Sequence, residues 1–421
     1  MKVLFIALGF PLPANSGAAI ATLETLRSIH SLCDLHLLSP RPETENTARV
    51  AELEQLLPGV TLHFYERRPI QAGRFEMYKT AVQTAFSGKT YWGSMWMNPK
   101  LRLAVKSLAA KHDYDVVHCD WLQPAVSLRG LDLPVLIRTL DVHFPGMIEW
   151  ANDPAFGGKL RKLYWQTQGQ RFRRFEAETL RAVPVVVTVS AEDEAVLRRE
   201  GVSQVVTIPP PREVEPEVAS RESNERPMIL FMGRLDMPVN REAFFVFTDK
   251  VLPHVGSETR ARVNIIFAGG FPDEAVRRRA AECDIEIRAP LSNEEARELL
   301  AQAELFLSPV VSGTGIKIKT LEAMANGKAI IGFAEAFRGV PLEDGVHALI
   351  ANSPEEFARS IEELAQDVSK SRRIGQAARE FVRLNYDPAT LAARLVGAYS
   401  QTIERFHQSR AHRASSLEFS L

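Results

Sequence analysis

A length of 421 residues is enough for about two domains, and a composition of 45% hydrophobic and 24% charged residues is that of an ordinary globular protein. The formal net charge of −1 provides no overall attraction to nucleic acid, so we expect no nucleic-acid partner. The three cysteines stand far apart, at positions 33, 119 and 283, which argues against a disulfide framework and against a structural zinc site.

The first half of the chain alternates short apolar runs with helical patterns, which is typical of βα units around a parallel sheet. Buried strands are predicted at residues 3–8, 34–38, 116–118, 135–138 and 185–189. A helix over residues 18–31 follows the first strand, and Ser190 before two acidic residues is typical of a helix N-cap. The apolar run at residues 3–10 is too short for a signal peptide or a spanning helix, so we expect a cytoplasmic protein.

Prolines interrupt this alternation at residues 209–227, where neither a strand ladder nor a helix interior can continue. Further strands are then predicted at residues 228–232, 264–268, 286–287, 305–307 and 329–333. We therefore predict an α/β protein with two tandem doubly wound domains that face a cleft. The expected parts are a first domain (1–210), a linker (211–227), a second domain (228–386), a C-terminal helix that packs back on the first domain (387–408) and a flexible tail (409–421).

The segment at residues 308–327 is the most informative part of the sequence. A buried strand ends at Ser308, a turn containing Gly313 and Gly315 follows, and a helix is predicted to start near residue 315 or 316. Glycines let the backbone approach a ligand closely, and the amides at a helix start bind anions. The segment therefore predicts an anion site.

Two lysines, Lys317 and Lys319, stand at this same helix start. Positive charge there is unfavourable for an isolated helix by about 0.3–1 kcal/mol, which suggests that an anion belongs in the site. Lys319 and Glu322 are three residues apart, so a surface ion pair is the alternative interpretation. Together with the turn, these residues favour the binding of a phosphate and a ribose.

The run Leu-Glu-Ala-Met-Ala at residues 321–325, closed by Gly327, resembles the nucleotide-sugar site of GT-B glycosyltransferases, in particular the large retaining family four. The resemblance implies two Rossmann-like domains and a role for Glu322 in binding the ribose hydroxyls. It covers nearly the whole chain and is strongest at residues 305–335. The version with lysines in the turn resembles the subset of transferases that act in exopolysaccharide biosynthesis.

The sequence departs from the family pattern at two positions. Many members carry a glutamate eight residues before the ribose-binding one, where this chain has Thr314. The family also pairs a Gly-Arg after the first strand of the second domain with a lysine six residues beyond the arginine. Here Arg234 fits, but Asn240 replaces the lysine. We therefore expect Lys317 or Lys319 to supply the missing charge, and we keep a strand-end ion pair with Asp236 as the alternative for Arg234.

In the first domain the resemblance implies further site residues. Gly17 occupies the position of a glycine loop that faces the diphosphate, and His143 that of a histidine that binds the donor sugar. His118, Asp120 and Asp141 lie near predicted strand ends and are candidates for the acceptor side, with solvated loop carboxylates as the alternative for the two aspartates.

The resemblance implies transfer of a sugar from a nucleoside-diphosphate sugar to a glycan, lipid-linked or small-molecule acceptor. Retention of configuration and catalysis by protein cations, without a metal or another cofactor, are expected. The catalytic candidates are His143, Lys317 and Arg234, and the donor-binding candidates are Gly17, Arg234, Gly313, Thr314, Gly315, Lys317, Lys319 and Glu322. Two alternatives stay open: a sugar-nucleotide epimerase on the same fold, and a catalytically silent nucleotide-sugar-binding subunit.

Two segments combine basic and aromatic residues. Residues 66–112 contain nine lysines and arginines around Trp92 and Trp96, and residues 161–174 form a second basic cluster with Trp165 and Phe172. This pattern suits peripheral contact with the inner face of a membrane or a lipid-linked acceptor. A helix that packs its aromatic side chains into the core and exposes a basic face is the alternative.

Overall fold

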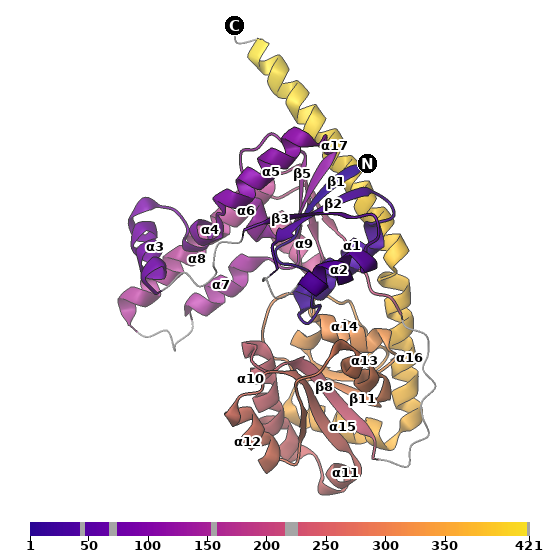
Figure 1. Cartoon of the computed structure of the whole chain (residues 1–421). Coiled ribbons are helices and arrows are strands. Elements are labelled where there is room, and N and C mark those ends of the chain that lie inside the picture. Colours follow the sequence, from indigo (N-terminus) through magenta and orange to yellow (C-terminus); the bar gives the residue numbers. More distant parts are fainter. Residues whose placement is uncertain (43–46, 67–73, 153–157, 215–225, 419–421) are drawn as a thin grey trace. The chain divides into compact units, whose positions relative to one another are not determined.

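The structure is a computed structural model that describes residues 1–42, 47–66, 74–152, 158–214 and 226–418 (Figure 1). It divides into two compact units. The first comprises residues 1–14, 18–210 and 389–421, and the second comprises residues 15–17 and 211–388. Each unit contains one parallel sheet with helices between its strands, so the predicted α/β class is confirmed.

The sheet of the first unit has seven strands in the order β3-β2-β1-β4-β5-β6-β7, all parallel. Their bounds are β1 Lys2–Ile6, β2 Asp34–Pro40, β3 Thr61–Tyr65, β4 Val116–Asp120, β5 Val135–Thr139, β6 Val185–Thr188 and β7 Val205–Thr207. The five strands predicted in this half all form. The sequence did not predict β3, which is only partly buried at the edge of the sheet, or β7, which has three residues.

Helices lie between these strands, and α17 from the C-terminal end of the chain also belongs to the first unit. Their bounds are α1 Gly17–Ile29, α2 Thr47–Leu56, α3 Arg74–Ser87, α4 Tyr91–Trp96, α5 Pro99–Lys111, α6 Leu122–Val126, α7 His143–Asn152, α8 Lys159–Arg181, α9 Ala191–Arg199 and α17 Pro388–Glu418. The predicted N-cap is confirmed, because the Ser190 hydroxyl accepts the backbone N–H of Asp193 at the start of α9. Asn98 caps α5 in the same way, with Pro99 at its first position.

The sheet of the second unit is also parallel, with the order β10-β9-β8-β11-β12-β13. Its strands are β8 Met228–Arg234, β9 Asn264–Gly270, β10 Glu286–Arg288, β11 Leu305–Ser308, β12 Ala329–Phe333 and β13 Leu349–Ala351. Its helices are α10 Pro238–Val246, a π-helical turn Phe247–Val251, 3₁₀ turns at Leu252–His254 and Ala334–Phe337, α11 Ser257–Arg262, α12 Glu274–Glu282, α13 Asn293–Gln302, α14 Ile318–Ala325, α15 Pro354–Gln366 and α16 Val368–Asn385. The short strand β13 was not predicted.

In both sheets the first strand of the unit lies in the interior, and the chain order reverses beside it. The reversal falls between β1 and β4 in the first sheet and between β8 and β11 in the second. Residues 3–6 of β1 are fully buried, which explains why this strand reads as an unbroken apolar run. In doubly wound sheets, ligands bind at the carboxyl ends of the strands beside such a reversal.

The C-terminal helix α17 groups with the first unit from residue 389 onward. Tyr399 on this helix is fully buried, and its hydroxyl lies 2.7 Å from Nδ1 of His118. The tail that the sequence predicted from residue 409 is helical as far as Glu418, because α17 continues without a break.

Among the described residues, no helix is both long enough and apolar enough to cross a membrane.

Candidate functional site

The carboxyl edge of the second sheet brings together the ends of β8, β9 and β11. A Cβ atom on Gly269 would collide with the carbonyl oxygen of Gly233, so the close approach of β8 and β9 at this point requires glycine. β11 ends at Ser308, whose hydroxyl lies 3.1 Å from Oγ1 of Thr320 and joins the strand end to α14. Because β11 pairs in parallel with β8, the turn after β11 begins at the same edge of the sheet as the end of β8.

The turn after β11 contains two glycines in the left-handed region, Gly313 (φ 95°) and Gly315 (φ 70°). The ammonium group of Lys317 donates to the carbonyl oxygens of Gly313, Thr314 and Gly315 at 3.0, 3.2 and 3.1 Å. Lys317 is the N-cap residue of α14, which begins at Ile318 rather than near residue 315 as predicted. The helix starts later because glycines at positive φ cannot belong to it.

Glu322 lies on α14 at the centre of a group of cations. Its Oε2 is 2.8 Å from Nζ of Lys319 and 3.8 Å from Nη2 of Arg212. Burial by itself would raise the pKa of Glu322, but Lys319, Arg212 and Arg297 hold it below its ordinary value. The carboxylate is therefore ionised at neutral pH, and the ion pair with Lys319 that was the alternative interpretation is present.

Arg212 is a site residue that the sequence did not single out. It belongs to the proline-rich segment that was interpreted as a linker, and its backbone N–H donates to the carbonyl oxygen of Tyr386 at 2.9 Å. Its Nη2 is buried and has no hydrogen-bond partner among the described residues. An unsatisfied buried guanidinium N–H beside Glu322 is a candidate donor to a bound ligand. No local sequence signal identifies it.

Arg234 lies at the end of β8. Its guanidinium group binds Asp236 at 2.5 Å and stacks on the Phe271 ring, with 5.1 Å from Cζ to the ring centroid. The strand-end ion pair that was the alternative interpretation is therefore present. Asn240 donates its Nδ2 to the carbonyl oxygen of Arg234 at 2.9 Å, so this side chain stabilises the end of the strand.

Gly17, the glycine that the sequence proposed to face a diphosphate, is the first residue of α1. It lies in the short segment 15–17, which groups with the second unit. Its role as an amide donor stays a prediction.

The carboxyl edge of the first sheet contains a second group of polar side chains, centred on His143 at the start of α7. Nδ1 of His143 lies 3.3 Å from Glu176, and Nε2 lies 3.6 Å from Asp141 and 3.0 Å from Gln123. Burial by itself would lower the pKa of His143, but these carboxylates raise it to about 9. Trp96 makes an edge-to-face contact with the ring. The imidazole is therefore held as a cation at neutral pH, next to the Asp141 that the sequence selected.

Two neighbours of His143 were not predicted. Trp121 has φ 87° and ψ 157°, a conformation that glycine favours and that costs other residues about 1–3 kcal/mol. Its indole Nε1 is buried and has no hydrogen-bond partner in the described part of the chain. Asp193 accepts a hydrogen bond from the Ser190 hydroxyl at 3.0 Å, and burial together with the nearby Asp141 raises its pKa to about 6. Strain and an unsatisfied donor beside shifted pKa values are typical of functional sites.

His118 and Asp120, expected on the acceptor side, are fully buried within the first unit. His118 stacks on Phe5 with ring centroids 4.2 Å apart and contacts Tyr399. Asp120 accepts a hydrogen bond from Nε of Arg138 at 2.6 Å; burial would raise its pKa, but Arg138 and His118 lower it to about 2. The acceptor-side prediction is therefore wrong for both residues, because β4 continues through Asp120 and places them in the core.

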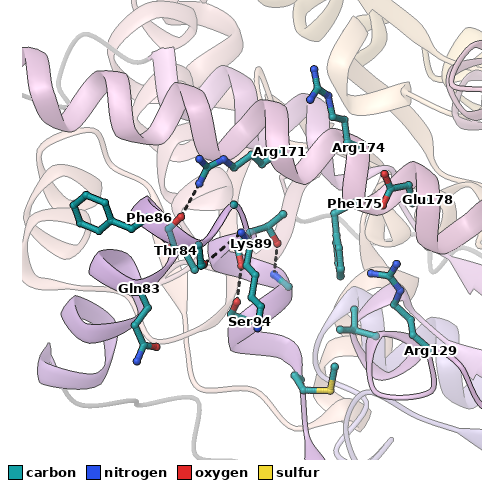
Figure 2. Close-up of a pocket in the computed structure, with 16 residues that line it drawn as sticks. Gln83, Thr84, Phe86, Lys89, Ser94, Arg129, Arg171, Arg174, Phe175 and Glu178 are labelled. Atoms are coloured by element: carbon teal, nitrogen blue, oxygen red, sulfur yellow. Dashed lines mark hydrogen bonds between the residues drawn. The ribbon is translucent and has the colours of Figure 1, made fainter.

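A pocket of about 1220 Å³ opens in the first unit between α3, α4 and α8 (Figure 2). Arg129, Arg171 and Arg174 line it together with Phe175. Arg171 donates to the carbonyl oxygen of Thr84 at 2.6 Å, and the Arg129 guanidinium lies 4.9 Å from the centroid of the Phe175 ring. The two basic segments that the sequence singled out meet here. Phe172 is fully buried, and Trp92 and Trp96 pack against the core of the first unit. These aromatic side chains therefore pack as the alternative interpretation expected, while Arg173 and Arg174 on the same helix as Phe172 are exposed.

Comparisons with known proteins connect these sites to a family. Residues 226–367, which contain Arg234 and Glu322, match the family model described as glycosyl transferases group 1. Over 396 residues, the chain is 22% identical to the "Uncharacterized 44.6 kDa protein in cps region" of Klebsiella pneumoniae, covering 92% of this chain and 96% of that protein.

Solved structures resemble the whole chain in fold. The crystal structure of Anabaena HepE in complex with UDP and glucose has a TM-score of 0.65 and 13% identity, covering 95% of this chain and 99% of that one. Sucrose-phosphate synthase from Thermosynechococcus elongatus has a TM-score of 0.69 and 16% identity, with the same coverage of each chain. The chain therefore has the GT-B fold of two Rossmann-like domains, and its residues 226–367 are similar to the glycosyl transferases group 1 family.

Proposed function

We propose that this protein transfers a sugar from a nucleoside-diphosphate sugar to an acceptor in polysaccharide biosynthesis, with retention of configuration and without a metal ion. The observation that carries the proposal is the ionised Glu322 between Lys319 and Arg212, beside the turn after β11. Lys319 and Glu322 lie in the segment that matches the family model, whereas Arg212 precedes it, and HepE, which has the same fold, binds UDP and glucose. The relative in a cps region supports the place in polysaccharide biosynthesis.

In this proposal the second unit binds the nucleotide. Arg234, Lys317 and Lys319 bind the diphosphate, together with the backbone amides of the turn. The diphosphate replaces the carbonyl oxygens that Lys317 contacts in this structure. The two carboxylate oxygens of Glu322 accept hydrogen bonds from the ribose hydroxyls. Lys317 and Lys319 take the role of the lysine that is absent at Asn240.

The proposed chemistry is dissociation of the sugar from the diphosphate. The bond between the anomeric carbon and a diphosphate oxygen breaks, the acceptor hydroxyl attacks from the same face, and its proton passes to the departing oxygen. Fixed cations stabilise the negative charge that develops on the diphosphate, which is usually the largest catalytic contribution. His143, held in its charged form, donates a hydrogen bond to the transferred sugar.

The first test is thermal stabilisation by UDP, GDP, ADP, dTDP and CMP with EDTA present. A ligand at about 100 times its dissociation constant adds roughly 2.7 kcal/mol of stability, which raises the melting temperature measurably. We expect a nucleoside diphosphate to stabilise the chain and the double variant Lys317→Ala, Glu322→Ala to lose the effect. No stabilisation by any of them would contradict the proposal.

A catalytically silent subunit is the second candidate, because Thr314 is not a carboxylate and Asn240 binds the backbone of β8. It predicts nucleotide binding without turnover. Incubating the stabilising nucleotide sugar with and without acceptor separates the cases. Transfer supports the main proposal, no product supports the silent subunit, and a free epimerised nucleotide sugar without acceptor identifies an epimerase.

The acceptor in this proposal is lipid-linked and is reached at an anionic membrane surface. Large apolar side chains are exposed on α3 and α8, with Tyr78 72%, Phe86 90% and Leu160 85% exposed. The exposed basic residues Arg161 and Lys162 lie beside Leu160 on α8, a helix that extends from the sheet of the first unit with α3 and α4 (Figure 1). Basic charge next to exposed apolar side chains complements anionic lipid headgroups.

We expect the chain to co-sediment with vesicles that contain an anionic lipid at low salt and to release at high salt, since the attraction is electrostatic. The double variant Phe86→Ser, Leu160→Ser should bind several-fold more weakly, because it removes the apolar part of the contact. The control Leu384→Ser removes a leucine of the second unit that is 62% exposed, and this variant should bind like the wild type. Equal sedimentation of both variants would contradict membrane contact through this surface.

A further inference from the structure

Three histidines gather at the amino ends of β2 and β3 in the first unit. His36 lies on β2, His63 lies on β3, and His112 is the C-cap residue of α5. One ring nitrogen from each lies within 4.8 Å of the other two, and Nδ1 of His36 is 3.1 Å from Nε2 of His63. Their side chains come from three segments far apart in sequence, and none of them belongs to the candidate sites described above.

The register of the sheet explains part of this grouping. His36 pairs with Thr61 and Leu38 pairs with His63. Because side chains alternate along a strand, His36 and His63 project from the same face of the sheet. The end of α5 packs over that face and brings His112 and Tyr114 to the pair, with the ring of His112 centred 5.0 Å from that of His36 and 6.1 Å from that of His63.

Further oxygen atoms surround the three rings. The Tyr114 hydroxyl is 2.8 Å from Nδ1 of His36, and Oδ1 of Asp34 is 3.6 Å from its Nε2. A carboxylate near the other nitrogen of a ligating histidine is the usual partner that orients the ring.

The alternative is a hydrogen-bonded aromatic cluster without a ligand. A hydrogen bond between His36 and His63 explains the shortest distance in the cluster. It does not explain why a third imidazole offers its nitrogen within 4.8 Å of both. In a tetrahedral site with Zn–N distances of about 2.0–2.1 Å, ligand nitrogens lie about 3.4 Å apart, so small side-chain rotations close the group around one ion.

We propose that His36, His63 and His112 bind one divalent transition-metal ion of the zinc type, with the Tyr114 hydroxyl or a water molecule as the fourth ligand. Three imidazoles suit zinc, copper or nickel rather than magnesium or calcium. The site lies at the amino end of the strands, whereas His143 lies at the carboxyl edge of the same sheet. The ion therefore joins the edge strand β3 to β2 and to the end of α5, and it acts on stability rather than on sugar transfer.

The direct test is calorimetric titration of the full chain with Zn²⁺ after removal of chelator. We expect one ion per chain with micromolar or tighter affinity. The double variant His63→Ala, His112→Ala should bind at least about 100-fold more weakly, because two of three protein ligands are lost. His254→Ala, which removes an exposed histidine of the second unit, is the matched control and should bind like the wild type.

Cobalt keeps the proposal testable even if the double variant folds poorly. Co²⁺ bound to the wild-type chain should show the intense visible bands of tetrahedral coordination, and Zn²⁺ should displace it. Zn²⁺ should also raise the melting temperature of the first unit by a few degrees. Absence of a stoichiometric ion, a weak octahedral cobalt spectrum, or unchanged affinity in a folded double variant would overturn the proposal. The nucleotide test is made in EDTA, so failure of one proposal leaves the other intact.

Discussion

Replacing Glu322 with alanine is expected to weaken binding of the stabilising nucleoside diphosphate by roughly 10- to 100-fold, since hydrogen bonds to a charged group contribute about 1.5–3 kcal/mol. The carboxylate is ionised and held between Lys319 and Arg212, so its oxygens can accept hydrogen bonds from the ribose hydroxyls of the proposed substrate. Isothermal titration of the wild type and of the variant with the same nucleotide measures the change.

Measuring the affinity for pyrophosphate, which has no ribose, distinguishes ribose binding by Glu322 from a purely structural ion pair. Loss of Glu322 leaves Lys319 and Arg212 without their carboxylate, so affinity for pyrophosphate should stay the same or rise while affinity for the nucleotide falls. If both affinities rise together, Glu322 only neutralises the cations, and its proposed contact with the ribose is wrong. Glu298→Ala, an exposed glutamate on α13, is the matched control and should change neither affinity.

Raising the pH from 6.5 to 9 is expected to remove roughly 3 kcal/mol of unfolding free energy from the first unit. Burial by itself lowers the pKa of His143, but Glu176 and Asp141 raise it to about 9, above its ordinary value of 6.5. A group with a raised folded-state pKa stabilises fully below its unfolded pKa, and the contribution is lost as the pH rises through the folded value. Stability should therefore fall across this window.

Tryptophan fluorescence isolates this effect, because all five tryptophans, at positions 92, 96, 121, 150 and 165, belong to the first unit. Urea unfolding followed by this signal at several pH values gives the free energy of that unit. His143→Gln should flatten the profile between pH 6.5 and 9, whereas His254→Ala in the second unit should leave it unchanged. An unaltered slope in His143→Gln would show that another group titrates in this range.

Most of the fold could be predicted because strands of a parallel sheet are buried on both faces. Such strands read as continuous apolar runs, and those predicted in each half of the chain form in the structure. The strands that escaped prediction, β3, β7 and β13, have three to five residues and lie at or beside the sheet edges. Short strands with partly exposed side chains leave no apolar run to detect.

The candidate site of the second unit could be predicted from the sequence only for those residues that lie close together along the chain. Lys319 and Glu322 share a face of α14 by helix spacing alone, and the glycine turn precedes them directly. Arg212 completes the group from a segment more than a hundred residues earlier. Only the folding of that segment against Tyr386 brings its guanidinium to Glu322, so no local pattern could identify it.

The sequence by itself determined the fold class, the two sheets and the charged turn, because these follow from hydrophobic periodicity and from residues adjacent in the chain. Only the tertiary structure decided which histidines and aspartates are available for chemistry. β4 continues two residues beyond its predicted end and buries His118 and Asp120, whereas His143 follows β5 and begins a helix. The tertiary structure also brought His36, His63 and His112 together. Burial and long-range proximity depend on strand register and on helix packing, which the order of residues along the chain does not display.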